Sequence, residues 1–183
     1  MKKLLFLLFL VVAALDASAQ TDKGNIMVGG QLALSTNKDG SDFRFNPQFG
    51  YFVAKNFAFG GEMNFDFSKS GTIRVNEFGI GPFARYYFGK SQTKPFLVTS
   101  ADYISTTTKA NNIESNATGW SLLAGAGFAA FLNRTVAVEG IIGYRYANYS
   151  NTEGTGGLNL SLGFQLYFGK ELPGDIKKTV TGQ

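Results

Sequence analysis

A strict two-residue alternation of apolar and polar side chains in residues 57–67, FAFGGEMNFDF, constrains the fold more than any other feature. One side carries the large apolar residues Phe57, Phe59, Met63, Phe65 and Phe67, and the other carries Ala58, Gly60, Glu62, Asn64 and Asp66. Successive side chains of a β-strand point to opposite faces, so this segment is expected to be a strand with one apolar face. The polar face is small and rich in glycine. We therefore expect a barrel with its apolar side chains outside and its polar ones inside.

The same alternation recurs in seven other segments, so the sequence predicts an all-β fold, an eight-stranded antiparallel up-and-down transmembrane β-barrel. The predicted strands are residues 25–35, 43–53, 57–67, 74–88, 95–105, 118–132, 136–149 and 157–168. Connections 54–56, 89–94 and 133–135 are short, whereas 36–42, 68–73, 106–117 and 150–156 are mostly longer and polar. Short turns and longer loops should therefore lie at opposite ends, with both termini at the short-turn end.

The first nineteen residues have the pattern of a secretory signal peptide. Lys2 and Lys3 precede an apolar run over residues 4–15, and Ala17-Ser18-Ala19 supplies the small residues of a cleavage site. The run is too short to span a bilayer as a helix, and a retained anchor is the alternative. We expect three parts: a signal peptide over 1–19, the barrel over 20–168 and a short polar tail over 169–183.

Composition excludes several functional classes. Without residues 1–19, 15 basic and 12 acidic side chains remain, a net charge of +3 that is too mild and too scattered for nucleic-acid binding. The chain has no cysteine, which excludes disulfides, thiolate zinc sites and lipoprotein attachment, and we expect no cofactor and no bound metal. No later stretch approaches eighteen consecutive apolar residues, so a membrane-spanning chain must be a closed barrel.

The distribution of lysine argues against a soluble β-sandwich. Such a sheet has a water-facing side, on which charged residues including lysine are common. All the lysines after residue 19 fall outside or at the margins of the predicted strands: Lys23, Lys38, Lys55, Lys69, Lys90, Lys94, Lys109, Lys170, Lys177 and Lys178. We therefore expect lipid on one face of the strands and a packed lumen on the other.

The chain resembles the eight-stranded outer-membrane β-barrel family typified by OmpX and the transmembrane domain of OmpA. The resemblance covers about residues 24–168 and includes segment 124–146, but it is most specific in the last strand, at Ser161, Gly163, Leu166 and Phe168. These four residues look like the signal that the barrel assembly machinery reads in that family. The resemblance implies a bacterial outer-membrane location, contact with outer-membrane lipid and periplasmic termini. One departure is the tail that follows Phe168.

Eight charged residues are predicted to face the lumen: Arg44, Glu62, Asp66, Glu77, Arg85, Asp102, Glu139 and Arg145. Counted from the short turns, Arg85 and Glu139 form a low layer, while Arg44, Asp66 and Arg145 form a high one. Buried charges must pair, so we interpret this set as a network that plugs the lumen. A gated ion path is the alternative. Glu62 and Asp102 have the least obvious partners, and we expect one of them to be protonated or water-bound.

No catalytic residue is predicted. Lipid A acyltransferases, lipid A deacylases and outer-membrane proteases share the barrel architecture, but each resembled class uses a histidine, and this chain has none. A hydrolase built on Glu62 and Asp66 alone is the remaining enzymatic alternative. Gly79-x-Gly81 and Gly125-x-Gly127 precede no amphipathic helix, so we interpret them as space for large lumen side chains rather than as dinucleotide loops.

These observations favour a non-enzymatic barrel with a role in surface interaction or envelope integrity. The neutral polar segment 106–117 is predicted to be the loop that contacts an extracellular ligand. Two other functions stay open: a narrow porin-like channel for ions or small solutes, and a soluble lipocalin-like carrier.

Overall fold

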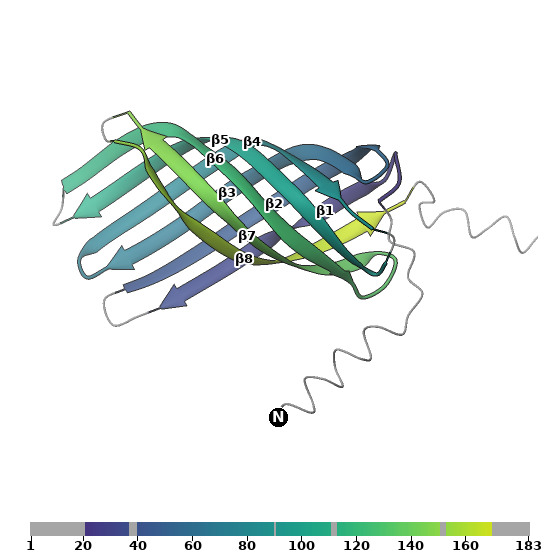
Figure 1. The fold of residues 1–183 in the computed structure, drawn as a ribbon. Coiled ribbons are helices and arrows are strands. Elements are labelled where there is room, and N and C mark those ends of the chain that lie inside the picture. The colour runs from purple at the N-terminus through teal and green to yellow at the C-terminus, as the bar shows by residue number, and fades with distance from the viewer. Residues whose placement is uncertain (1–20, 37–39, 90, 111–112, 151–152, 170–183) are drawn as a thin grey trace, which may run out of the picture.

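The computed structural model describes residues 21–36, 40–89, 91–110, 113–150 and 153–169, and these form one closed antiparallel barrel (Figure 1). Each strand pairs with its neighbour in the sequence, and β1 pairs with β8. The strands are β1 (Ile26–Thr36), β2 (Gly40–Ala54), β3 (Phe57–Ser70), β4 (Ile73–Tyr87), β5 (Thr93–Ala110), β6 (Ile113–Phe131), β7 (Val136–Tyr149) and β8 (Thr155–Phe168). The predicted fold class is confirmed. The predicted signal peptide and most of the predicted tail lie outside the described residues. Among the described residues, no helix is long and apolar enough to cross a membrane.

The two ends of the barrel differ in their connections. Ile26 at the start of β1 pairs with Phe168 at the end of β8. Both residues therefore lie at the end of the barrel that carries the turns 55–56, 88–92 and 132–135. We call this the turn end and the opposite one the loop end. In Figure 1 the turn end is on the right.

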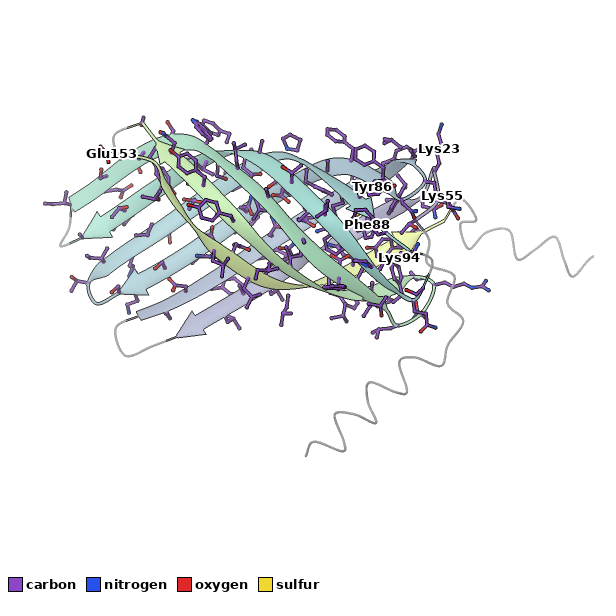
Figure 2. The ribbon with its side chains drawn as sticks, viewed as in Figure 1. Lys23, Lys55, Tyr86, Phe88, Lys94 and Glu153 are labelled. Atoms are coloured by element: carbon purple, nitrogen blue, oxygen red, sulfur yellow. The ribbon has the colours of Figure 1, made fainter. Side chains whose placement is uncertain are left out.

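Exposed apolar side chains alternate with buried or polar ones along the strands. Large apolar side chains cover the exterior, with Leu34, Leu158 and Leu160 each more than 70% exposed. Aromatic pairs lie near both ends of this surface: Phe43 with Phe67, Trp120 with Tyr146, and Tyr86 with Phe88. Figure 2 shows Tyr86 and Phe88 near the turn end, close to the region of Lys23, Lys55 and Lys94, and Glu153 at the loop end.

The prediction that residues 106–117 form a loop is wrong. β5 continues to Ala110 and β6 begins at Ile113, and their ladder runs without interruption from Thr106↔Ala117 to Ala110↔Ile113. Threonine is enriched in β-strands, and residues 106–108 are three consecutive threonines. The segment is polar and lacks apolar alternation although it is paired, so its polarity does not indicate a loop. It is a paired hairpin.

Three lysines that lie outside the predicted strands fall within the observed ones, because the observed strands are longer than predicted. Lys69 lies near the end of β3, Lys109 near the end of β5, and Lys94 near the start of β5. Lys94 is buried, and its ammonium group donates to Thr21 Oγ1 over 2.7 Å. All three remain in the terminal residues of their strands, away from the middle of the barrel wall.

The lumen near the turn end is not simply polar, contrary to the expectation of a polar interior. Large side chains with almost no exposure fill it: Met27, Phe52, Phe83, Tyr87, Phe96, Phe131 and Tyr167. The Tyr167 ring lies 4.8 Å from that of Phe131, and the Tyr87 ring lies 5.2 Å from that of Phe96. Dispersion and burial of this area hold the turn end together as a small core.

Candidate functional site

The candidate site is the lumen, where the inward charges form two separate networks. Near the turn end, Arg85 from β4 and Glu139 from β7 meet across the barrel, with 2.6 Å between Nη1 and Oε2. Both side chains are completely buried. The guanidinium carbon also lies 5.0 Å from the centre of the Phe96 ring and 5.4 Å from that of Phe83. In this dry surrounding each charge depends on the other, because an unpaired buried ion is strongly unfavourable.

Neutral polar groups satisfy much of the remaining hydrogen-bonding capacity of this pair. Tyr167 donates its hydroxyl to Glu139 Oε1 over 2.7 Å. Arg85 Nη2 and Gln165 Nε2 both donate to Gln48 Oε1, and Gln48 in turn donates to Glu62 Oε2 over 2.6 Å. Strands β2, β3, β4, β7 and β8 therefore contribute to one hydrogen-bonded network across the lumen.

Near the loop end, Arg145 from β7 holds two carboxylates on the opposite wall. Its Nη2 lies 2.9 Å from Glu77 Oε1, and its Nη1 lies 3.3 Å from Asp66 Oδ2. The second oxygen of Asp66 lies 3.0 Å from Arg44 Nε. Glu77 also accepts hydroxyls from Tyr149 and Thr106. The Arg44 side chain is 52% exposed, so this network reaches the surface of the barrel.

The two remaining acids lie between these networks and bridge to no arginine in the described part of the chain. Glu62 accepts from Gln48, and Asp102 Oδ2 accepts weakly from Ser121 and Ser100 over 3.3 and 3.5 Å. The other oxygen, Asp102 Oδ1, is buried and has no hydrogen-bond partner among the described residues. Both acids line a small cavity of about 60 Å³. The protonation of either acid stays a prediction.

The four residues of the predicted assembly signal all lie on β8. Ser161 faces the lumen and donates to Gln31 Oε1 of β1 over 2.8 Å. Gly163 also faces inward, opposite Gln31, whereas Leu166 and Phe168 belong to the outer face. This arrangement gives the motif a local structural role in joining β8 to β1. Its recognition by an assembly machinery stays a prediction.

Sequence reasoning missed the part that glutamine and aromatic residues play in the lumen. Gln48 and Gln165 connect the buried ion pair to both β2 and β8, and Phe52 packs against Tyr87 and Tyr167. Phe52 has the same parity as the inward residues Arg44 and Gln48, so strict alternation would have placed it correctly. The glutamine contacts depend on the relative height of strands far apart in sequence, which alternation does not give.

The described residues include no group of three or more His, Cys, Asp or Glu side chains arranged to hold a metal ion. The side-chain interactions described in the lumen are ion pairs and neutral hydrogen bonds. A tightly packed turn-end network and a partly hydrated loop-end network share one barrel.

These features define a transmembrane-type β-barrel with a filled lumen and an apolar exterior. A family model described as "Outer membrane protein beta-barrel domain" matches residues 4–168, and the chain belongs to that family of outer-membrane proteins. No curated protein matches the sequence.

Solved structures share the fold at low sequence identity. Neisserial surface protein A has a TM-score of 0.57 and 19% identity, with 78% of this chain and 93% of that one covered. The N-terminal β-barrel domain of Pseudomonas aeruginosa OprF has a TM-score of 0.57 and 11% identity, covering 81% and 100%. Ail, the attachment invasion locus protein of Yersinia pestis, has a TM-score of 0.50 and 14% identity, covering 80% and 99%.

Proposed function

We propose that this protein is a non-enzymatic barrel of the bacterial outer membrane that presents the β5–β6 hairpin at the cell surface. The turn end and both termini then face the periplasm, after removal of residues 1–19. The assembly machinery would read the β8 residues Ser161, Gly163, Leu166 and Phe168 during insertion. A transmembrane strand needs about 9–11 residues. β5 has 18 and β6 has 19, so this hairpin extends well beyond the membrane.

The exposed edge of the hairpin supports a role in surface contact. β7 pairs with β6 only from Gly119 onward, which leaves the edge of residues 113–117 uncovered by β7. Ile113 on this segment is 73% exposed. An extended peptide can add to such an edge through main-chain hydrogen bonds. The hairpin is held by Lys109 with Glu114 at 2.8 Å and by Thr107 with Asn116 at 2.8 Å.

The buried turn-end network supports the proposal that the barrel does not conduct ions or solutes. Arg85, Glu139 and the surrounding aromatic rings leave no exposed side-chain surface on the ion pair. A small barrel is normally filled in this way. We therefore propose that the lumen is plugged near the periplasmic end.

Shortening the hairpin tests the surface role. Replacing residues 107–116 with Asn-Gly joins the paired residues Thr106 and Ala117 by a two-residue turn. Heat-modifiable gel mobility should be retained, because the membrane-spanning ladders are untouched, whereas binding of cells to host or neighbouring-cell surfaces should fall to the level of a deletion strain. A control variant, Lys109→Gln with Glu114→Gln, keeps the hairpin length. Unchanged binding by the shortened protein would contradict the surface role.

A narrow channel is the second candidate, favoured by the hydrated Arg44–Asp66–Arg145 network at the loop end. Planar bilayer recordings of the refolded protein distinguish the two functions. The plugged barrel should give no stable unitary steps. Steps that change in size when Arg44 or Arg145 is replaced with alanine would establish the channel instead.

A further inference from the structure

Two basic residues lie side by side on the outer face of the barrel, near the loop end. Lys69 of β3 pairs directly with Arg74 of β4. Side chains of directly opposite residues share one face of a sheet, with Cβ atoms about 5 Å apart. That face is the outer one, because Lys69 has the same parity along β3 as the exposed residues Met63 and Phe67. Both basic side chains are themselves exposed.

This pair of cations has no counter-charge within the described part of the chain. Neither Lys69 nor Arg74 forms an ion pair with a described carboxylate. The next cation in the same row is Lys109 of β5, which is opposite Arg74, but Glu114 neutralises it at 2.8 Å. Like charges directly opposite each other destabilise a sheet. An anion from outside the chain would remove this repulsion between Lys69 and Arg74.

The two cations stand just beyond the part of the wall that is long enough to span a membrane. A tilted transmembrane strand needs about 9–11 residues. Residues 57–67 of β3 supply this length, and the facing residues 76–86 of β4 supply it on the next strand. Lys69 and Arg74 are the next outward residues on these two strands. Basic side chains at this position reach the layer of lipid headgroups, where anionic groups lie.

A pocket of about 390 Å³ joins this basic pair to the apolar exterior. Leu34, Phe43 and Phe67 contribute its apolar part, and Lys69 and Arg74 contribute its basic part. The Phe43 and Phe67 rings are stacked, with 6.2 Å between their centroids. Such a surface packs well against an alkyl chain through dispersion contacts. The pocket therefore meets the two chemical requirements of a lipid with an anionic head.

We propose that Lys69 and Arg74 bind the phosphate monoester of a lipid whose alkyl chain lies against the stacked phenylalanine rings. A guanidinium donates two parallel hydrogen bonds to phosphate, an ammonium adds a point charge, and two cations match the two charges of a monoester. Among the described lining residues Asp42 is the one acid, and it alternates along β2 with the inward Arg44. The proposal rests on the proposed orientation of the barrel only for the leaflet that supplies the lipid, the outer one.

Dilauroylphosphatidic acid and dilauroylphosphatidylcholine, which share their acyl chains and differ in head charge, test the site. Native mass spectrometry of the refolded protein, released from an uncharged maltoside detergent, should show a single-lipid adduct with the phosphatidic acid at concentrations about tenfold or more below those needed for the phosphatidylcholine. Glycerol 3-phosphate, which has the same head without acyl chains, should not displace the lipid at equal concentration. Equal binding of the two lipids would overturn the assignment of the head, and displacement by glycerol 3-phosphate would overturn the assignment of the lipid.

Charge-removing variants locate the site on the barrel. Lys69→Gln with Arg74→Gln should weaken the phosphatidic acid adduct about tenfold or more. Two controls should bind as the unchanged protein does: Lys109→Gln with Glu114→Gln, which removes the neighbouring neutral ion pair, and Arg134→Gln, which removes an exposed charge at the turn end. Heat-modifiable mobility establishes that each variant folds. The assignment is wrong if the folded K69Q/R74Q protein binds as well as the controls, and because binding is measured in detergent, that failure leaves the orientation and the surface role of the hairpin untouched.

Discussion

The turn-end and loop-end halves of the lumen contain the same kind of ion pair in opposite surroundings. Arg85 and Glu139 are fully buried among aromatic rings, beside a β1–β8 ladder that is intact. Arg145 and Asp66 are each 20% exposed, and both line a small cavity near the loop end, where the β1–β8 ladder has ended. The comparison teaches that an ion pair alone does not bury its charges. At the turn end, aromatic side chains surround the pair and the β1–β8 ladder runs beside it.

Removing the acid of the turn-end pair should have the largest effect. Glu139→Gln leaves the Arg85 guanidinium buried without a counter-charge, which costs about 3–5 kcal/mol of folding free energy. Urea unfolding in phospholipid vesicles, followed by heat-modifiable mobility, measures this loss. Replacing both partners, as Arg85→Met with Glu139→Leu, should restore most of the stability, since no charge is then left unpaired. A single variant as stable as the double one would contradict the buried-pair interpretation.

The matching change at the loop end should have a much smaller effect. Asp66→Asn removes one partner of Arg145, but Arg145 keeps Glu77 at 2.9 Å and the group remains open to water. We expect a loss of about 1 kcal/mol or less in the same unfolding measurement. If the losses for D66N and E139Q were equal, the two halves of the lumen would not differ as described.

Alternation in the sequence predicted the barrel well because lipid and lumen impose opposite demands on neighbouring residues. Segment 57–67 illustrates this, since its apolar and polar faces both lie where predicted. Alternation does not reveal the strands within 106–117, because this segment is polar on both faces. The observed strands also extend further than predicted at both ends of the barrel, so that Lys69 and Lys109 at the loop end and Lys94 at the turn end lie within strands.

The candidate site was less accessible from sequence than the fold. Counting residues from the turns put Arg85 and Glu139 at one height and Arg44, Asp66 and Arg145 at another, and the structure brings each group together. Counting residues from the turns does not predict where the β1–β8 ladder ends, because this ladder joins residues more than 120 positions apart. Neither strand has a proline at this point, so no local sequence signal marks where the ladder ends.

Thiol labelling of the folded protein tests the difference between the two halves most directly, since the native chain has no cysteine. Alanine-to-cysteine variants change little volume and can be placed at inward positions in both halves. Ala33 lines the cavity and Ala147 the loop-end mouth, whereas Ala129 and Ala137 near the turn end have no exposure. In vesicles, a water-soluble maleimide should label A33C and A147C readily, but A129C and A137C only after unfolding. Rapid labelling of A129C and A137C in the folded barrel, or protection of all four, would contradict this account.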